Sequence, residues 1–144
     1  MRRGYWGVAL YQPKNEYNWG TVLRSCYNFG ADFVITIGHR YKKQCSYTVA
    51  ADRHIPVFHY PDIENFLNAL PVNCIVVPVE TNGSTNLFSF CHPERAVYVF
   101  GGEDLTLPES IMKFPRSAFI QTNRCLNLSV AASIVMYDRL LKRQ

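Results

Sequence analysis

One stretch of the sequence, Asn18 to Arg24, combines residue types that could hold an anionic oxygen. Gly20 and Arg24 are four residues apart, so they share one strip of a predicted helix. The guanidinium of Arg24 stays charged and donates up to five hydrogen bonds. Gly20 would leave the backbone bare beside it. The alternative is a solvated arginine on a helix that merely tolerates its glycine, and this stretch alone does not decide between the two.

Three loops that follow predicted strands could form one ligand site. They are "ETNGST" (80–85), "GGEDLTLPES" (101–110) and "QTNRCLNLS" (121–129). In open α/β sheets, ligands bind beyond the carboxyl ends of the strands. Gly101 and Gly102 permit close backbone approach to a ligand. The glycine fingerprints of dinucleotide and triphosphate sites and the serine-hydrolase elbow are absent from the sequence.

The elements that would position these loops follow one pattern along the whole chain. Apolar, β-branched runs alternate with helical patterns, which predicts a single α/β domain over 1–144, with helices on both faces of a largely parallel sheet. Strands are expected over 5–11, 32–38, 55–60, 74–79, 96–101 and 117–122. Helices are expected over 18–29, 62–70 and 127–143, with a short fourth helix near Pro108. Gly30 should end the first helix and Asp62 should cap the second.

The final predicted helix is apolar around most of its circumference. We expect its core stripe to consist of Val130, Ile134, Tyr137 and Leu141. Further apolar side chains surround that stripe: Ala131, Ala132, Val135, Met136 and Leu140. A helix of this kind must be buried on more than one side. A homodimer interface would cover the second side, and a central helix within a monomer is the alternative.

Composition excludes several classes of protein. The 144 residues are 48% hydrophobic and 18% charged, which is typical of a globular domain. The net charge of +4 permits a nucleic-acid partner without requiring one. The five cysteines are odd in number and lack paired spacing, so neither a disulfide framework nor a metal site is expected. No signal peptide or membrane span is evident, and we expect a reduced, cytoplasmic protein.

Three ordered motifs resemble those of a known enzyme family. "NWGTVLRSC" has the form N-x-G-x-x-x-R, and it is followed by "VFGGEDLTLP" and "CLNLSVAASIVMYD". Together they are similar to the three motifs of the SpoU (TrmH) branch of the SPOUT methyltransferases, from Leu10 to Leu140. The resemblance implies S-adenosylmethionine-dependent methylation of an RNA ribose 2′-hydroxyl. It also implies a deep C-terminal trefoil knot and a homodimer.

The resemblance also implies roles for individual residues. Arg24 would be the principal catalytic residue and would act near a cofactor bound largely by the other subunit. The remaining catalytic positions would be Asn18, Glu103, Asn127 and Ser129. The cofactor would be held, mainly through main-chain groups, by Val79, Glu80, Thr81, Gly101, Ile120, Cys125, Leu126 and Leu128.

A basic segment interleaved with aromatic residues is the expected RNA contact. It spans 38–47, and such a segment suits phosphate contact with base stacking. A solvated charged loop is the alternative. The expected RNA-binding residues are Arg40, Tyr41, Lys42, Lys43, Arg53 and Arg124. By the family resemblance, tRNA is the first expected substrate and rRNA the second.

Three positions depart from the family pattern and keep other functions open. Thr106 stands where the family usually has glycine, Gln121 stands where it usually has proline, and Cys125 stands where it often has serine. A thiol is a weaker hydrogen-bonding group than a hydroxyl. One alternative is therefore a non-catalytic protein of the same fold that binds RNA or cofactor. Another is an α/β nucleotide-binding enzyme unrelated to RNA.

Overall fold

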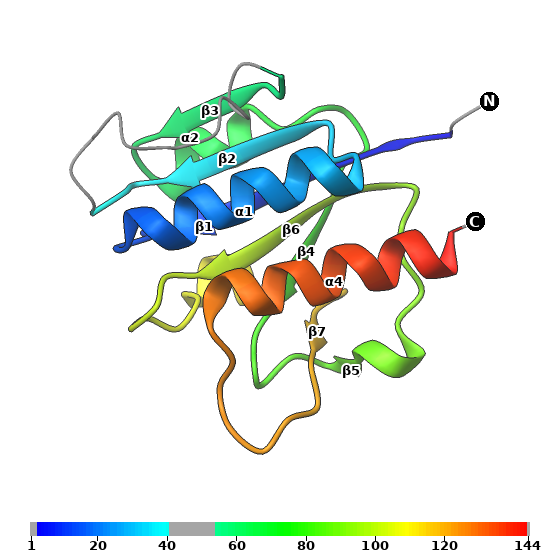
Figure 1. Ribbon diagram of the computed structural model, residues 1–144. Helices are drawn as coiled ribbons and strands as arrows, with labels where there is room; N and C mark the ends of the chain where they lie inside the picture. Colours follow the sequence, from blue (N-terminus) through cyan, green and yellow to red (C-terminus); the bar gives the residue numbers. More distant parts are fainter. Residues whose placement is uncertain (1–2, 41–53, 144) are drawn as a thin grey trace.

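The computed structural model describes residues 3–40 and 54–143, and its core is a parallel seven-stranded sheet (Figure 1). The strand order is β3-β2-β1-β6-β4-β7-β5, and every strand pair is parallel. The strands are β1 (Tyr5–Tyr11), β2 (Phe33–Ile37), β3 (Val57–Tyr60), β4 (Ile75–Val79), β5 (Thr85–Asn86), β6 (Arg95–Gly101) and β7 (Ala118–Phe119). The predicted fold class, an α/β protein with a largely parallel sheet, is confirmed at this level.

Helices cover both faces of the sheet. On one face, α1 (Glu16–Phe29) and α4 (Leu128–Lys142) lie side by side (Figure 1). On the other face are α2 (Ile63–Asn68) and α3 (Glu109–Met112). The alternation of side chains along β1 explains the three layers, because Val8 and Leu10 pack in the core beneath α1 and α4, whereas Ala9 packs beneath α2 and α3. Within the described ranges, no helix combines the length and hydrophobicity that a membrane crossing requires.

Helix α1 begins two residues earlier than the sequence predicts. The side chain of Asn15 caps it by accepting hydrogen bonds from the backbone N–H groups of Tyr17 and Asn18. The helix ends at Gly30, whose φ of 84° is the left-handed conformation expected there. Its buried residues recur every three or four positions and form one apolar face: Trp19, Val22, Leu23 and Cys26.

The predicted core stripe of α4 is wrong. Ala132, Val135 and Met136 are buried against the sheet and α1. The residues expected in the core are instead exposed: Val130 (46%), Ile134 (38%), Tyr137 (55%) and Leu141 (54%). The helix has two apolar faces. The face that carries the small Ala132 can approach the sheet more closely than the face with the larger side chains. We name the exposed set the α4 stripe.

Residues 80–84 wrap around strand β7. Strand β7 lies between β4 and β5, and both Val79 and Thr85 are in register with Ala118. The connection from Val79 to Thr85 therefore encircles one side of Ala118. Its close fit is evident at Gly83, where an added Cβ would lie 2.3 Å from the Ala118 carbonyl oxygen. Strand β5 was not predicted and β7 is shorter than the predicted 117–122, because each has only two residues and no periodicity to detect.

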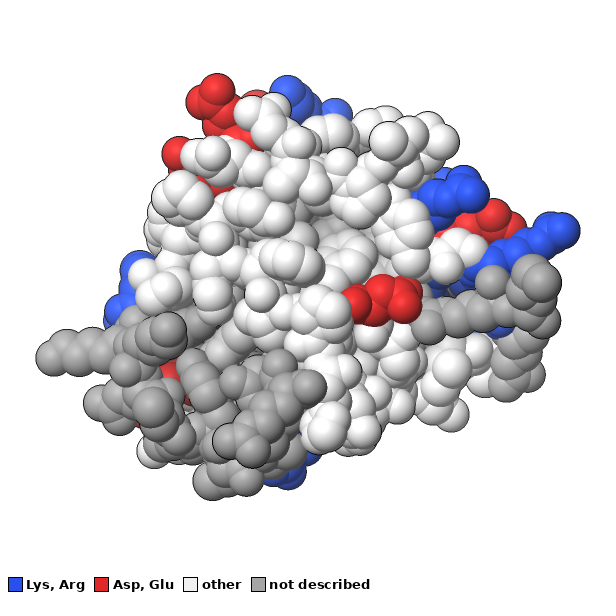
Figure 2. All heavy atoms as spheres, turned by 90° about the horizontal axis from the view of Figure 1, so that it is seen from above, with Lys and Arg blue, Asp and Glu red and all other residues white. Residues whose placement is uncertain are grey.

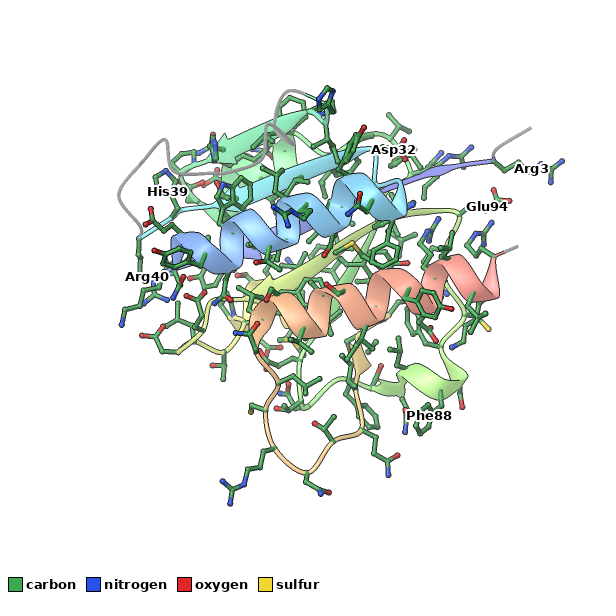
Figure 3. The ribbon with its side chains drawn as sticks, viewed as in Figure 1. Arg3, Asp32, His39, Arg40, Phe88 and Glu94 are labelled. Atoms are coloured by element: carbon green, nitrogen blue, oxygen red, sulfur yellow. The ribbon has the colours of Figure 1, made fainter. Side chains whose placement is uncertain are left out.

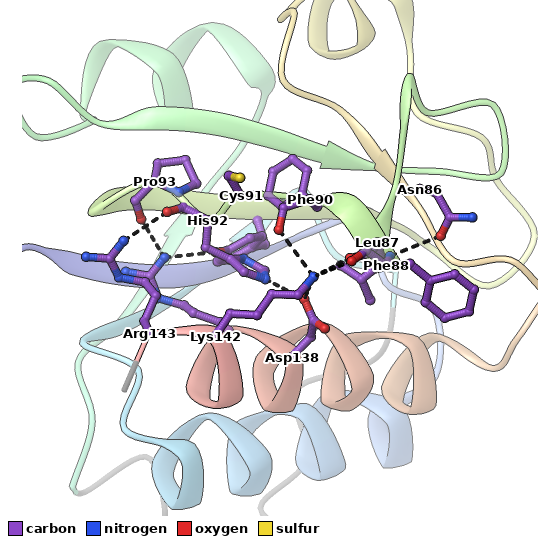
Figure 4. A network of polar contacts seen from close by, with 12 residues as sticks. Asn86, Leu87, Phe88, Phe90, Cys91, His92, Pro93, Asp138, Lys142 and Arg143 are labelled. Carbon is purple, nitrogen blue, oxygen red and sulfur yellow. Dashed lines mark hydrogen bonds and ion pairs between the residues drawn. The ribbon is translucent and has the colours of Figure 1, made fainter.

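The carboxyl-terminal half of α4 is tied to the segment that precedes β6 by a polar network (Figure 4). Lys142 Nζ donates to the carbonyl oxygens of Phe88 and Phe90, each at 3.2 Å. The buried Arg139 donates to Tyr98 OH at 2.9 Å. Since arginine has no acceptor, the Tyr98 hydroxyl is free to donate its own proton to His92 Nδ1, at 2.7 Å. His92 Nε2–H then donates to Asp138 at 2.7 Å.

We expect this network to make stability depend on pH. Burial lowers the pKa of His92, although its hydrogen bond to Asp138 opposes the shift. The unfolded chain therefore binds a proton more readily than the folded one, and the free energy of unfolding should fall as the pH drops below about 6.5. Urea unfolding at pH 7.5, 6.5 and 5.5 measures this decline. The variant His92→Gln, which cannot take a proton, should show a shallower decline, and equal slopes would contradict the prediction.

Candidate functional site

A cavity of about 430 Å³ lies at the carboxyl ends of β4 and β6, where the chain beyond β7 also passes. It is lined by Val79, Glu80, Thr81, Phe100, Gly101, Gly102, Glu103, Leu105, Ile120, Thr122, Cys125, Leu126, Asn127, Leu128 and Ala131. The volume falls within the range of small-molecule sites, about 300–1,000 Å³. The three loops singled out in the sequence therefore meet at one place.

All eight positions expected to contact a cofactor lie on this cavity. The lining is mixed in character, with apolar residues of β4, β6 and α4 beside polar and glycine residues of the loops. At Gly101 an added Cβ would lie 2.9 Å from the Leu105 carbonyl oxygen, so a larger residue would press on the cavity wall. Sequence reasoning missed Leu105 and Thr122, because nothing in their residue types marks them as ligand contacts.

The carboxylate of Glu103 joins the loop after β6 to the start of α1. It accepts hydrogen bonds from the backbone N–H groups of Lys14 (3.2 Å) and Asn15 (2.6 Å). The backbone N–H of Gly102 donates to the Tyr11 carbonyl at 2.7 Å. A carboxylate near a helix N-terminus is also favoured by the helix dipole. Glu103 thus holds the cavity rim in place as well as lining it.

Asn18, Asn127 and Ser129 form a hydrogen-bonded cluster between the two helices. The Asn127 side-chain N–H donates to Asn18 Oδ1 at 3.1 Å, and the Ser129 hydroxyl approaches the same oxygen at 3.4 Å. Asn127 also caps α4 by accepting from the backbone N–H of Ser129 at 2.9 Å. The first and third motifs therefore touch, although they are more than 100 residues apart in the chain.

Arg24 does not line the cavity. It is exposed on α1, and within the described residues its side chain has no hydrogen bond or ion pair. The next residue, Ser25, is hydrogen bonded to Ser133 of α4 at 3.0 Å. Ser133 lines a second, mainly apolar groove of about 420 Å³, formed with Thr21, Ser129, Val130, Ile134, Tyr137, Asp138 and Leu141. Thr21, which also lines this groove, is three residues before Arg24, so both lie on the same side of α1.

Only part of the expected RNA-binding set lies in the described residues. Arg40 is paired with Asp104 at 2.5 Å and donates to the Gln12 carbonyl at 3.0 Å. The hydrogen bond from Arg40 lowers the pKa of Asp104. Figure 3 shows Arg40 beside the amino-terminal end of α1, where the strands end. Arg124 is exposed in the loop before α4. Four predicted contacts lie outside the described residues: Tyr41, Lys42, Lys43 and Arg53.

The architecture defines a class of protein. A parallel α/β sheet carries a cavity built from three strand-end loops, and an amide and hydroxyl cluster lies at its edge. Among the residues that the structure describes, no group of histidine, cysteine, aspartate or glutamate is arranged to hold a metal ion. The position of the cavity, at the carboxyl ends of parallel strands, is typical of ligand sites in open α/β sheets. The chain belongs to the SpoU rRNA methylase family, whose model matches residues 6–137.

Known proteins resemble the chain over nearly its whole length. A tRNA (cytidine(34)-2′-O)-methyltransferase of Methylovorus glucosotrophus is 28% identical, and the match covers 91% of each chain. A structure concerned with the 2-OH methylation of C/U34 on tRNA has a TM-score of 0.85 at 24% identity, covering 98% of this chain and 99% of that one. The methyltransferase AviRb of Streptomyces viridochromogenes, solved in complex with AdoMet, has a TM-score of 0.87 at 20% identity, covering 99% and 59%.

Proposed function

We propose that this protein methylates the ribose 2′-hydroxyl of nucleotide 34 in tRNA, with S-adenosylmethionine as the methyl donor. The main support for this proposal is that three distant loops meet at one cavity. All eight positions expected to contact the cofactor line that cavity. The family match and the tRNA methyltransferase of Methylovorus glucosotrophus support the reaction and the substrate. Ribosomal RNA is the second candidate substrate.

The cavity residues fit this donor by their chemistry. Apolar walls from Val79, Ile120 and Leu128 suit an adenine ring, and backbone groups near Gly101 suit its polar edges. When bound, S-adenosylmethionine supplies an electrophilic methyl group. Arg24 holds the phosphate or ribose of the substrate and stabilises negative charge that develops on the ribose oxygen. Asn18 and Asn127 keep the two helices and the cavity loop in a fixed relation.

A homodimer would complete the site. The α4 stripe exposes four large apolar side chains along one helix, and packing against a second copy would remove them from water. Arg24 is one turn after Thr21, which lines this groove, and in such a dimer it would meet the cofactor cavity of the partner. We also propose that the wrapped strand β7 and the return of the chain to α4 form a deep trefoil knot, an exception to the usual rule against threading.

RNA would contact Arg24 and Arg124, both of which are exposed. On the face seen from above in Figure 2, the charged side chains of the described residues lie mostly at the margins, and these residues form no broad basic patch between them. Arg40 would contribute less than the sequence suggests, because Asp104 already neutralises its charge. The expected contacts at Tyr41, Lys42, Lys43 and Arg53 remain part of the proposal.

Methyl transfer in vitro tests this function. Purified protein should incorporate methyl groups from labelled S-adenosylmethionine into unmodified tRNA, and mass spectrometry of nuclease fragments should place the group on the ribose of nucleotide 34. Ribosomal RNA serves as the comparison substrate. Binding of RNA and donor without any incorporation would contradict the proposal and favour a non-catalytic protein. Donor binding without RNA affinity, even at low salt, would favour an enzyme unrelated to RNA.

A further inference from the structure

The cavity has a negative charge that no basic lining residue offsets. Of the described residues that line it, Glu80 and Glu103 are acidic, and none is lysine, arginine or histidine. Glu103 faces the start of α1, where backbone N–H groups hold it. Glu80 is therefore the acidic residue whose charge could act on a ligand in the cavity.

Glu80 is fixed in orientation but not neutralised. One carboxylate oxygen accepts a hydrogen bond from the Leu107 backbone N–H at 3.0 Å, and the other accepts from the Thr81 N–H at 3.3 Å. Within the described part of the chain, the salt bridges do not include Glu80. Backbone donors leave the full negative charge in place, and the half-buried setting weakens its screening by water.

We propose that Glu80 makes this cavity selective for a cationic sulfonium cofactor over the corresponding neutral thioether. This inference rests on the proposed function. S-adenosylmethionine has a positively charged sulfur, whereas S-adenosylhomocysteine, the product left after methyl transfer, has a neutral one. The two molecules differ only in the transferred methyl group and in the positive charge that it gives the sulfur. A fixed carboxylate therefore favours the donor over the product, so the product is released more readily than the donor is lost.

Affinities for the two molecules test the inference without measuring methyl transfer. We would titrate S-adenosylmethionine and S-adenosylhomocysteine by calorimetry into the wild-type protein and into Glu80→Gln. The variant should lower the ratio of the two affinities, donor over product, by about three- to tenfold. Glu109→Gln is the matched control, because Glu109 is exposed on α3 and does not line the cavity. It removes the same charge and should leave the ratio unchanged.

The ratio separates a charge effect from a structural one. If Glu80 merely held Leu107 and Thr81 in place, both molecules would bind more weakly by the same factor, and that result would overturn the inference. Glu80→Asp keeps the charge, so the ratio should survive in it even if both affinities fall. If the wild-type protein binds neither molecule, the proposed function fails as well. If it binds both and methylates tRNA, an unchanged ratio in Glu80→Gln refutes the inference alone.

Discussion

Replacing Arg24 with alanine should reduce methyl transfer to tRNA by at least about a hundredfold. The affinity for S-adenosylmethionine should change by less than about threefold, because Arg24 does not line the cavity of its own chain. Its guanidinium is free to reach an RNA oxygen, since within the described residues it has no partner. Single-turnover rates with saturating donor, together with donor titrations, measure the two effects separately.

Two comparisons sharpen the prediction for Arg24. Arg24→Lys keeps the charge but loses the planar set of donors, so it should recover little activity. Asn28→Ala changes an exposed residue one turn further along α1 and should leave the rate unchanged. Near-normal turnover in Arg24→Ala would show that the residue is a surface charge.

Co-expressed mixed dimers address the position of Arg24. Arg24→Ala would be paired with Gly101→Val, whose side chain would collide with the Leu105 carbonyl. If Arg24 acts on the partner's cofactor, the mixed dimer should be more active than either variant alone. No gain would place Arg24 at the cofactor of its own chain.

Replacing Gly83 with alanine should lower the free energy of unfolding by about 3 kcal/mol and abolish binding of S-adenosylmethionine. The new Cβ would lie 2.3 Å from the Ala118 carbonyl oxygen and 2.4 Å from its carbon. These are backbone atoms, so no change of rotamer relieves the contact. Residues 80–84 would have to move away from β7 and distort the cavity wall at Glu80 and Thr81. Urea unfolding and calorimetric titration measure both effects.

Gly30→Ala is the matched control for Gly83. Gly30 also follows a regular element, but an added Cβ would meet nothing within 4 Å. Its cost comes from its left-handed φ of 84° and should be about 1–2 kcal/mol, with binding of the donor preserved. Equal effects of the two changes would mean that the tight contact around Ala118 is not required.

The sequence was most informative where the hydrophobic periodicity of a helix and the residues that end it indicate the same element. The apolar face of α1 and its end at Gly30 could both be predicted. The meeting of three loops followed from the rule that parallel strands end at one edge of the sheet. The face of α4 that contacts the sheet could not be predicted, because both faces are apolar and hydrophobicity does not distinguish a sheet contact from a surface.

For the site, too, individual residues could be predicted from the sequence, but their contacts with distant residues could not. The motif resemblance marked Asn18 and Asn127 as site candidates, but their contact across 109 positions depends on the tertiary fold. Glu103 was expected to take part in the reaction, and its hydrogen bonds to residues 14 and 15 give it an anchoring role as well. Arg40 and Asp104 are 64 positions apart, so no local sequence pattern could show that the charge of Arg40 is neutralised by an ion pair.

The turn around β7 has a consequence for how the chain reaches its native state. In the proposed knot, residues 80–84 leave the ribosome before Ala118, so the earlier segment has to stay open, or reopen, for the later one to pass through. Entropy opposes such an ordered insertion, and contacts between distant parts of a chain form slowly. Newly made molecules should therefore mature after synthesis, with the insertion of β7 as the slow step. A bulky fusion placed after α4 would delay that step more than the same fusion placed before β1.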